Sequence, residues 1–187
     1  LSGGGALILS SSYRMMERYA DALRDRLQHI RVKRQGDAGR EELRQWFKDD
    51  IDGVLVATRS FFTGVDVSGD ACRLVLIDRI PFGRPDDPVE QAVCAHLEDL
   101  ARDAGKRQTG FDLRTIPSAA MVLAQGAGRL IRSANDRGAV VVLDRRILDP
   151  KGCWKVLRLA LPAFPDTRNM GLIPNILGRT AAREARP

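Results

Sequence analysis

The sequence predicts an α/β fold with a mostly parallel central sheet covered by helices on both faces. Short apolar runs recur along the chain without polar alternation, which is typical of strands that are buried on both sides. Amphipathic segments with apolar residues three and four positions apart separate these runs. The length of 187 residues and the hydrophobic share of 44% predict one globular domain with a sizeable core.

Five segments have the pattern of buried strands and alternate with helices. The first apolar run ends at three serines that can cap the amphipathic helix behind it. A later helix begins where Asp87 can cap, Pro88 suits the first helical position and Glu90 can reach back to the cap. The predicted strands are 6–9, 30–34, 53–58, 74–77 and 139–143. The predicted helices are 13–27, a short one through Leu43, Trp46 and Phe47, one from Pro88 to about Ala101, and one from Pro117 to about Ser133.

Three loops are the candidates for a ligand site. In a parallel sheet, ligands bind at the loops outside the carboxyl ends of the strands. The loops expected there are Ser10–Ser12, Thr58–Asp66 and Asp78–Pro85.

The charge balance suits a polyanionic partner. Thirty Lys and Arg residues against twenty-four Asp and Glu residues give a net charge of +6. Most of the basic residues are arginines, and two explanations stay open: a biased genomic composition, or selection for phosphate recognition by the planar guanidinium.

Several classes of protein are excluded or disfavoured by what the sequence lacks. No apolar run approaches the ~18–20 residues of a membrane-spanning helix, and the first residues have no secretory signal, so we expect a soluble, intracellular protein without a membrane partner. Cys72, Cys94 and Cys153 are too far apart for a disulfide framework or a metal site, and His29 and His96 also lack metal-ligand spacing. The P-loop, the dinucleotide fingerprint and the nucleophile elbow are missing.

One segment combines an amide, a glycine and two arginines. Gln125, Gly128, Arg129 and Arg132 are spaced to share one face of the helix predicted after Pro117, with apolar residues on the other face. Glycine inside a helix lowers the stability of the helix by roughly 1 kcal/mol relative to alanine. This loss makes sense if a ligand approaches the helix closely there. Two guanidiniums one turn apart suit a triphosphate. The alternative is a solvated arginine face with a glycine for helix packing.

These residues carry a resemblance to a family. The stretch 125–132 resembles motif six of superfamily-two helicases, and with Asp136-Arg137-Gly138 it is similar to the DinG-type branch of the XPD-like DNA helicases. The stretch 6–13 resembles motif four of that family, 60–66 motif five, and 77–82 with Pro85 and Pro88 its proline-rich segment. The resemblance covers roughly residues 5–162.

The resemblance implies a RecA-like three-layer fold and a place in a larger protein. Residues 1–165 would be the second motor domain of an ATP-dependent DNA helicase of repair or replication, and 166–187 a loosely packed tail. The first motor domain, with the P-loop, the acidic Mg²⁺ motif and commonly an iron–sulfur cluster, would lie outside this chain. The start directly before a buried strand, without Met, also favours a cut from a longer protein. The expected location is the cytoplasm, at the nucleoid.

The resemblance also implies roles for individual residues. Arg129 and Arg132 would act as arginine fingers on the γ-phosphate of ATP, with Gln125 and Gly128 beside the nucleotide and Gly64 and Asp66 along its sugar and phosphates. A second set of residues would bind single-stranded DNA: Ser11, Ser12, Tyr13, Thr58 and Arg59. For Tyr13 a place in the apolar stripe of its helix, and for the two serines a capping role, stay open as alternatives.

The chain departs from the family pattern at three positions. Thr63 stands where the family usually has Glu, so the coupling of ATP to DNA through that loop cannot be carried over in detail. Ser10 replaces a usual Phe and Gly83 a common Pro.

The leading hypothesis is therefore a helicase motor domain that is active only together with its partner domain, on single-stranded and duplex DNA. The alternative is a catalytically silent RecA-like module that binds nucleic acid or regulates. A small-molecule enzyme on a Rossmann-like sheet is disfavoured because the sequence has no cofactor fingerprint.

Overall fold

A computed structural model describes residues 2–62, 71–128, 130, 137–149, 153–162 and 165–177. The chain forms two compact units. The first unit comprises 1–79, 126–143 and 165–187, and the second comprises 80–125 and 144–164.

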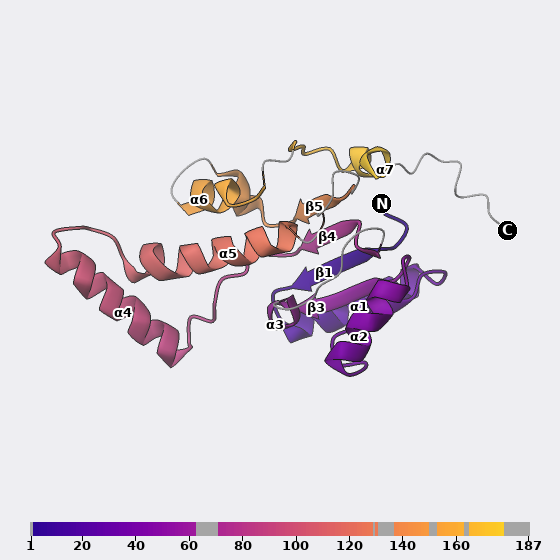
Figure 1. The fold of residues 1–187 in the computed structure, drawn as a ribbon, viewed down its shortest axis with the longest axis horizontal. Coiled ribbons are helices and arrows are strands. Elements are labelled where there is room, and N and C mark those ends of the chain that lie inside the picture. The colour runs from indigo at the N-terminus through magenta and orange to yellow at the C-terminus, as the bar shows by residue number, and fades with distance from the viewer. Residues whose placement is uncertain are drawn as a thin grey trace. The chain divides into compact units, whose positions relative to one another are not determined.

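A five-stranded sheet forms the centre of the first unit (Figure 1). Every pair of neighbouring strands is parallel, and the strand order is β2-β3-β1-β4-β5. The strands are β1 (Ala6–Ser10), β2 (Val32–Arg34), β3 (Val54–Thr58), β4 (Leu74–Ile77) and β5 (Ala139–Val142). The α/β prediction and all five predicted strands are thereby confirmed.

The strands are apolar throughout because side chains on both faces of the sheet are buried. On one face Ala6, Ile8 and Val56 form a core cluster with Met16 and Ala20 of helix α1 (Tyr13–Arg26). On the opposite face, reached by the alternating side chains, Leu7, Leu55 and Val75 are at most 2% exposed. Helix α2 (Arg40–Asp49) buries Leu43 and Phe47, as the sequence predicts. The short helix α3 (Arg59–Phe62) follows β3 directly.

Two helices begin at the predicted caps. The Oγ of Ser12 accepts a hydrogen bond from the backbone N–H of Met15 at 3.3 Å, so α1 starts behind the three serines. Asp87 caps α4 (Pro88–Asp103) by accepting from the N–H groups of Val89 and Glu90.

The Glu90 side chain has a stronger partner than the predicted cap. Its carboxylate accepts two hydrogen bonds from the guanidinium of Arg114, at 2.9 and 2.7 Å. The backbone N–H of Asp87 donates to the carbonyl of Arg84. A paired Arg fork binds a carboxylate more firmly than one backbone N–H does, and here it joins α4 to the turn η2 (Phe111–Thr115).

The helix after Pro117 ends earlier than the sequence pattern predicts. Helix α5 covers Ile116–Ala127, and Gly128 lies in the turn that follows, where the N–H of Leu130 donates to the carbonyl of Ala127. The prediction that the helix runs to about Ser133 with Gly128 on its polar face is therefore wrong. Gly126 and Gly128 supply the physical reason, because glycine lowers helix stability and favours helix ends.

The second unit is built around α4, η2 and the first part of α5. Phe82 packs against Phe111 and Trp154, with ring centroids 5.6 and 6.1 Å apart. The apolar stripe of α4 is largely exposed, with Val89 at 70% and Leu100 at 52%. The unit is completed by η3 (Arg145–Leu148) and α6 (Cys153–Leu159).

Part of the segment that the sequence analysis expects to be a loose tail packs in the first unit. The turn η4 (Met170–Leu172) leads into α7 (Ile173–Ile176). Ile173 and Leu177 are 4% and 9% exposed and belong to the same core cluster as α1. Among the described residues, no helix has the length and apolarity needed to cross a bilayer.

Candidate nucleic-acid interface

Polar side chains gather where the strands of the first unit end. Ser10 and Thr58, the last residues of β1 and β3, are neighbours in register. Gln35 follows β2 directly, and its backbone N–H donates to the carbonyl of Val56 on β3. Because the strands are parallel, these ends share one edge of the sheet, which we call the carboxyl edge.

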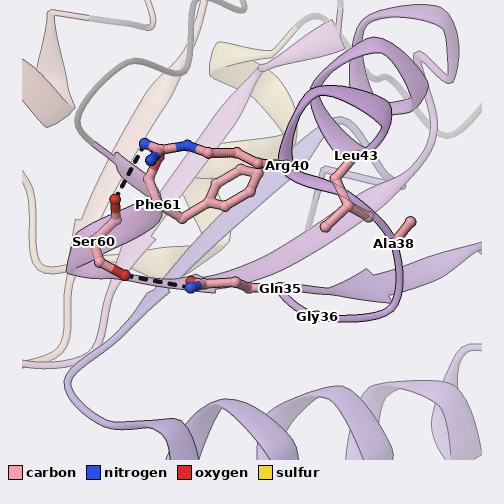
Figure 2. A pocket seen from close by; sticks show the side chains of 7 residues that line it. All are labelled: Gln35, Gly36, Ala38, Arg40, Leu43, Ser60 and Phe61. Carbon is pink, nitrogen blue, oxygen red and sulfur yellow. Dashed lines mark hydrogen bonds between the residues drawn. The ribbon is translucent and has the colours of Figure 1, made fainter.

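Gln35 makes four side-chain hydrogen bonds at this edge. Its Oε1 accepts from the backbone N–H of Thr58 at 3.0 Å and from the Thr58 hydroxyl at 2.9 Å. Its Nε2 donates to the Oη of Tyr13 at 3.1 Å and to the Oγ of Ser60 at 3.3 Å. Figure 2 shows the bond between Gln35 and Ser60. Gln35 thus ties the start of α1 to the end of β3.

A second pair at the edge joins Ser11 to Asp78, the residue after β4. The Ser11 hydroxyl donates to Oδ2 of Asp78 at 2.9 Å. Asp78 is only 6% exposed, and its Oδ1 has no hydrogen-bond partner among the described residues. Since a serine has one hydroxyl proton, Ser11 in this arrangement offers a DNA phosphate only its lone pairs, beside a carboxylate of the same charge sign as the phosphate.

Four of the five predicted DNA contacts divide into two groups by the partner of their hydroxyl proton. The protons of Ser11 and Thr58 are committed to Asp78 and Gln35. Ser12 and Tyr13 are exposed, and both accept a hydrogen bond, Ser12 from Met15 and Tyr13 from Gln35. Within the described part of the chain, their own O–H protons meet no acceptor.

Arg59, the fifth predicted contact, is half-buried at the start of α3, directly after Thr58. Gln35 belongs to none of the motifs that the sequence contains. The Gln-Gly pair at the end of a strand is a local signal only for a turn, so the partners of Gln35 become visible only when β2 and β3 are side by side.

A pocket of about 140 Å³ lies beside Gln35 in the first unit. Arg40 is one of its lining residues, and Figure 2 shows its side chain reaching toward Ser60. The guanidinium of Arg40 donates to the carbonyls of Ser60 and Phe61, both at 3.2 Å, and lies 5.5 Å from the Phe61 ring centre. Arg40 thereby holds the short helix α3 close to α2. The lining residues are Gln35, Gly36, Ala38, Arg40, Leu43, Ser60 and Phe61.

The predicted nucleotide-binding residues are only partly described. Gln125 is exposed near the end of α5, and Gly128 is exposed in the turn behind it. Four others, Gly64, Asp66, Arg129 and Arg132, lie outside the described residues, as does Thr63.

The described residues offer little for covalent or metal chemistry. Burial raises the pKa of Cys72 to about 12, so its thiol stays protonated and is a poor nucleophile. Cys94 and Cys153 are free thiols, and His96 is exposed on α4. Among the described residues, no three His, Cys, Asp or Glu side chains come together to hold a metal ion.

A parallel sheet with helices packed on it and polar side chains at its carboxyl edge defines an open-sheet α/β domain, whose ligands bind outside the carboxyl ends of its strands. Comparison with known proteins shows which family of α/β domains the chain belongs to. The chain belongs to the helicase C-terminal domain family, whose model matches residues 1–163.

Curated relatives share this domain. The ATP-dependent helicase DinG of Mycobacterium tuberculosis is 40% identical over 99% of the chain and 27% of that protein. The ATP-dependent DNA helicase YoaA of Haemophilus influenzae is 36% identical over 93% of the chain and 26% of that protein. The chain thus spans about a quarter of these relatives. A solved apo structure of XPD is 22% identical with a TM-score of 0.50, covering 86% of the chain and 32% of the XPD chain, a likeness in fold.

Proposed function

We propose that this chain is the second motor domain of an ATP-dependent DNA helicase, which binds single-stranded DNA at its carboxyl edge and supplies arginine fingers for ATP hydrolysis. The P-loop and the Mg²⁺ ligands would belong to the first motor domain. ATP held between the two domains would pull them together and hydrolysis would release them, so that an alternating grip moves the protein along one strand.

The observation that carries the DNA part of this proposal is the pair of outward O–H donors at the start of α1. Ser12 and Tyr13 are adjacent and exposed, and each accepts a hydrogen bond from the protein while its own proton meets no described acceptor. DNA phosphate oxygens are acceptors, so the two groups are complementary. The first turn of a helix also favours negative charge.

The arginine fingers are proposed from the residue pattern and the family. Gln125 and Gly128, which precede Arg129 in the sequence, are both exposed. A guanidinium is permanently charged and can stabilise the charge that develops on the γ-phosphate during transfer.

The test is ATP hydrolysis by the full-length protein, with and without single-stranded DNA. Arg132→Ala is expected to lower the DNA-stimulated turnover by ~10³-fold or more, as for arginine fingers in other phosphoryl-transfer enzymes. Arg107→Ala is the matched control, because Arg107 is an exposed arginine in the second unit, outside the proposed site. It should leave turnover unchanged.

Two results would contradict the proposal. Turnover of Arg132→Ala within a few-fold of wild type would remove the finger role. No ATP hydrolysis by the wild-type protein with any nucleic acid would instead favour a catalytically silent module that binds nucleic acid.

A further inference from the structure

We propose that Gln35 is a positioning residue that fixes the phenol of Tyr13 as a hydrogen-bond donor to the bound DNA strand. The inference rests on the proposed function, since it names a residue that prepares the DNA contact at the carboxyl edge. Gln35 itself would not touch the strand. Its effect would pass entirely through the hydroxyl of Tyr13.

The orientation of the Gln35 amide follows from its partner on β3. The backbone N–H of Thr58 can only donate, so the amide atom that it meets at 3.0 Å is the oxygen. The nitrogen must then face the other way. It carries two protons and accepts nothing, so it donates to the Oη of Tyr13 at 3.1 Å and to the Oγ of Ser60 at 3.3 Å.

The orientation of the Gln35 amide also fixes which neighbouring hydroxyl donates and which accepts. Thr58 gives its hydroxyl proton to Oε1 of Gln35 at 2.9 Å. In the contact of 2.9 Å between the hydroxyls of Thr58 and Ser60, the proton therefore comes from Ser60. The Thr58 side chain is buried, with the residue 7% exposed, so this arrangement is shielded from water on the β3 side.

Tyr13 is the member of this network whose proton is directed outward. Its Oη accepts from Gln35, so its O–H is left to donate to something else. Tyr13 is 60% exposed, and the described residues provide no acceptor for it. A phosphate oxygen of a strand that crosses the carboxyl edge would take this bond, and Gln35 would have oriented the donor beforehand.

Replacing the amide by a carboxylate reverses the direction of this bond. In Gln35→Glu, one oxygen can still accept from Thr58, but the other can only accept, so it takes the proton of Tyr13. The phenol then no longer donates outward. Tyr13→Phe removes the same donor directly, and because Tyr13 is exposed, this change leaves the core intact.

The experiment measures ATP turnover of the full-length protein against the concentration of oligo-dT. Gln35→Glu and Tyr13→Phe are each expected to raise the DNA concentration for half-maximal stimulation about fivefold to tenfold, with turnover at saturating DNA unchanged. In the double variant, the half-maximal DNA concentration should be less than about twofold higher than in Gln35→Glu alone, because both changes remove the same donor.

Gln28→Glu is the matched control. It makes the same charge change at an exposed glutamine just after α1, at the end of the helix away from Tyr13. Its half-maximal DNA concentration should stay close to that of wild type. If Gln35→Glu does not fold, Gln35→Met removes the bond that orients the phenol but leaves the phenol proton free, so it should raise the half-maximal DNA concentration less than Tyr13→Phe does.

The outcomes separate this inference from the proposed function. A wild-type protein that neither binds oligo-dT nor responds to it overturns both. A wild-type response with no effect of Tyr13→Phe overturns the positioning role alone. Effects of the Gln35 and Tyr13 changes that multiply in the double variant also overturn it, because they would show that Gln35 acts on stability or charge and not through the phenol.

Discussion

Asp144, two residues after the last strand, is a buried acid with a clear electrostatic role. Its carboxylate accepts two hydrogen bonds from the guanidinium of Arg146, at 2.9 and 2.6 Å, and one from the backbone N–H of Ile80 at 3.1 Å. These bonds, chiefly those from Arg146, lower the pKa of Asp144 to about 2. The carboxylate therefore fastens the start of η3 to the segment that follows β4.

The stability from this ion pair should depend on pH. The folded pKa lies below the ordinary value of 3.8, so the stabilisation is present above about pH 4 and is lost as the pH falls toward 2. Arg146 is half exposed, which weakens the pair, and we expect it to contribute about 1–2 kcal/mol near neutral pH. The difference in unfolding free energy between wild type and Arg146→Ala should therefore narrow by about 1 kcal/mol between pH 6 and pH 2.5.

Arg145→Ala is the control for this prediction. Arg145 is exposed beside Arg146, so its replacement removes a similar charge from the same turn without touching Asp144. The difference in unfolding free energy between wild type and Arg145→Ala should stay the same between pH 6 and pH 2.5. A constant difference for Arg146→Ala as well would mean that Arg146 acts through its contact with the ring of Trp154 and not through the carboxylate.

At the scale of single elements, the start of α1 caps its helix and, under the proposed function, would also contact DNA. The Ser12 hydroxyl oxygen caps the helix by accepting from Met15, while its own proton has no acceptor among the described residues and would donate to the proposed DNA strand. The same residue can serve both because a hydroxyl accepts and donates through different parts of the group. The two alternatives that the sequence leaves open, capping or DNA contact, are therefore compatible.

Substitutions at Ser12 should separate these tasks. Ser12→Ala loses the cap and should lower the free energy of unfolding by about 1 kcal/mol. Ser12→Asp keeps a capping oxygen, so stability should stay within about 0.5 kcal/mol of wild type, but its charge should repel the DNA phosphates. Thermal unfolding and oligo-dT binding of both variants check this prediction.

The matched control is Asp87→Ser, which makes the reverse exchange at the cap of α4. It should preserve stability equally well and leave DNA binding unchanged, since Asp87 lies in the second unit, outside the carboxyl edge. Unaltered DNA binding by Ser12→Asp would place the strand elsewhere on the domain.

At the scale of the whole molecule, the chain carries a proposed DNA edge but no phosphate cradle of the P-loop type. We therefore expect the 187-residue chain by itself to release no phosphate from ATP, with or without oligo-dT. It should still bind oligo-dT, with an affinity that falls as salt is raised, because each phosphate contact by a cation releases counterions. A phosphate-release assay and a salt titration of binding are the two measurements. DNA-stimulated ATP hydrolysis by this chain would contradict the proposal that the P-loop and the Mg²⁺ ligands belong to the first motor domain.

Much of the fold could be predicted because its determinants are local. The apolar runs of β1, β3 and β4 need burial on two faces, and the caps at Ser12 and Asp87 act within one turn of their helices. The end of α5 was mispredicted, since the apolar spacing continues past Ala127 while two glycines weaken the helix there. The burial of Ile173 and Leu177 could not be predicted, because a helix as short as α7 has too few residues to show a helical repeat of apolar positions.

The sequence by itself determined the α/β class, the order of the elements, the helix caps and the motifs that relate the chain to the helicases. Only the tertiary structure decided which polar groups meet at the carboxyl edge. Gln35 lies 22 residues from Tyr13 and 23 from Thr58 along the chain, and the parallel pairing of β2 with β3 brings it to Thr58. Hydrogen bonds between side chains depend on such long-range pairing, whereas strands and caps depend on neighbours in the sequence. For this reason the direction of each proton at the proposed DNA edge follows from the fold and not from any motif.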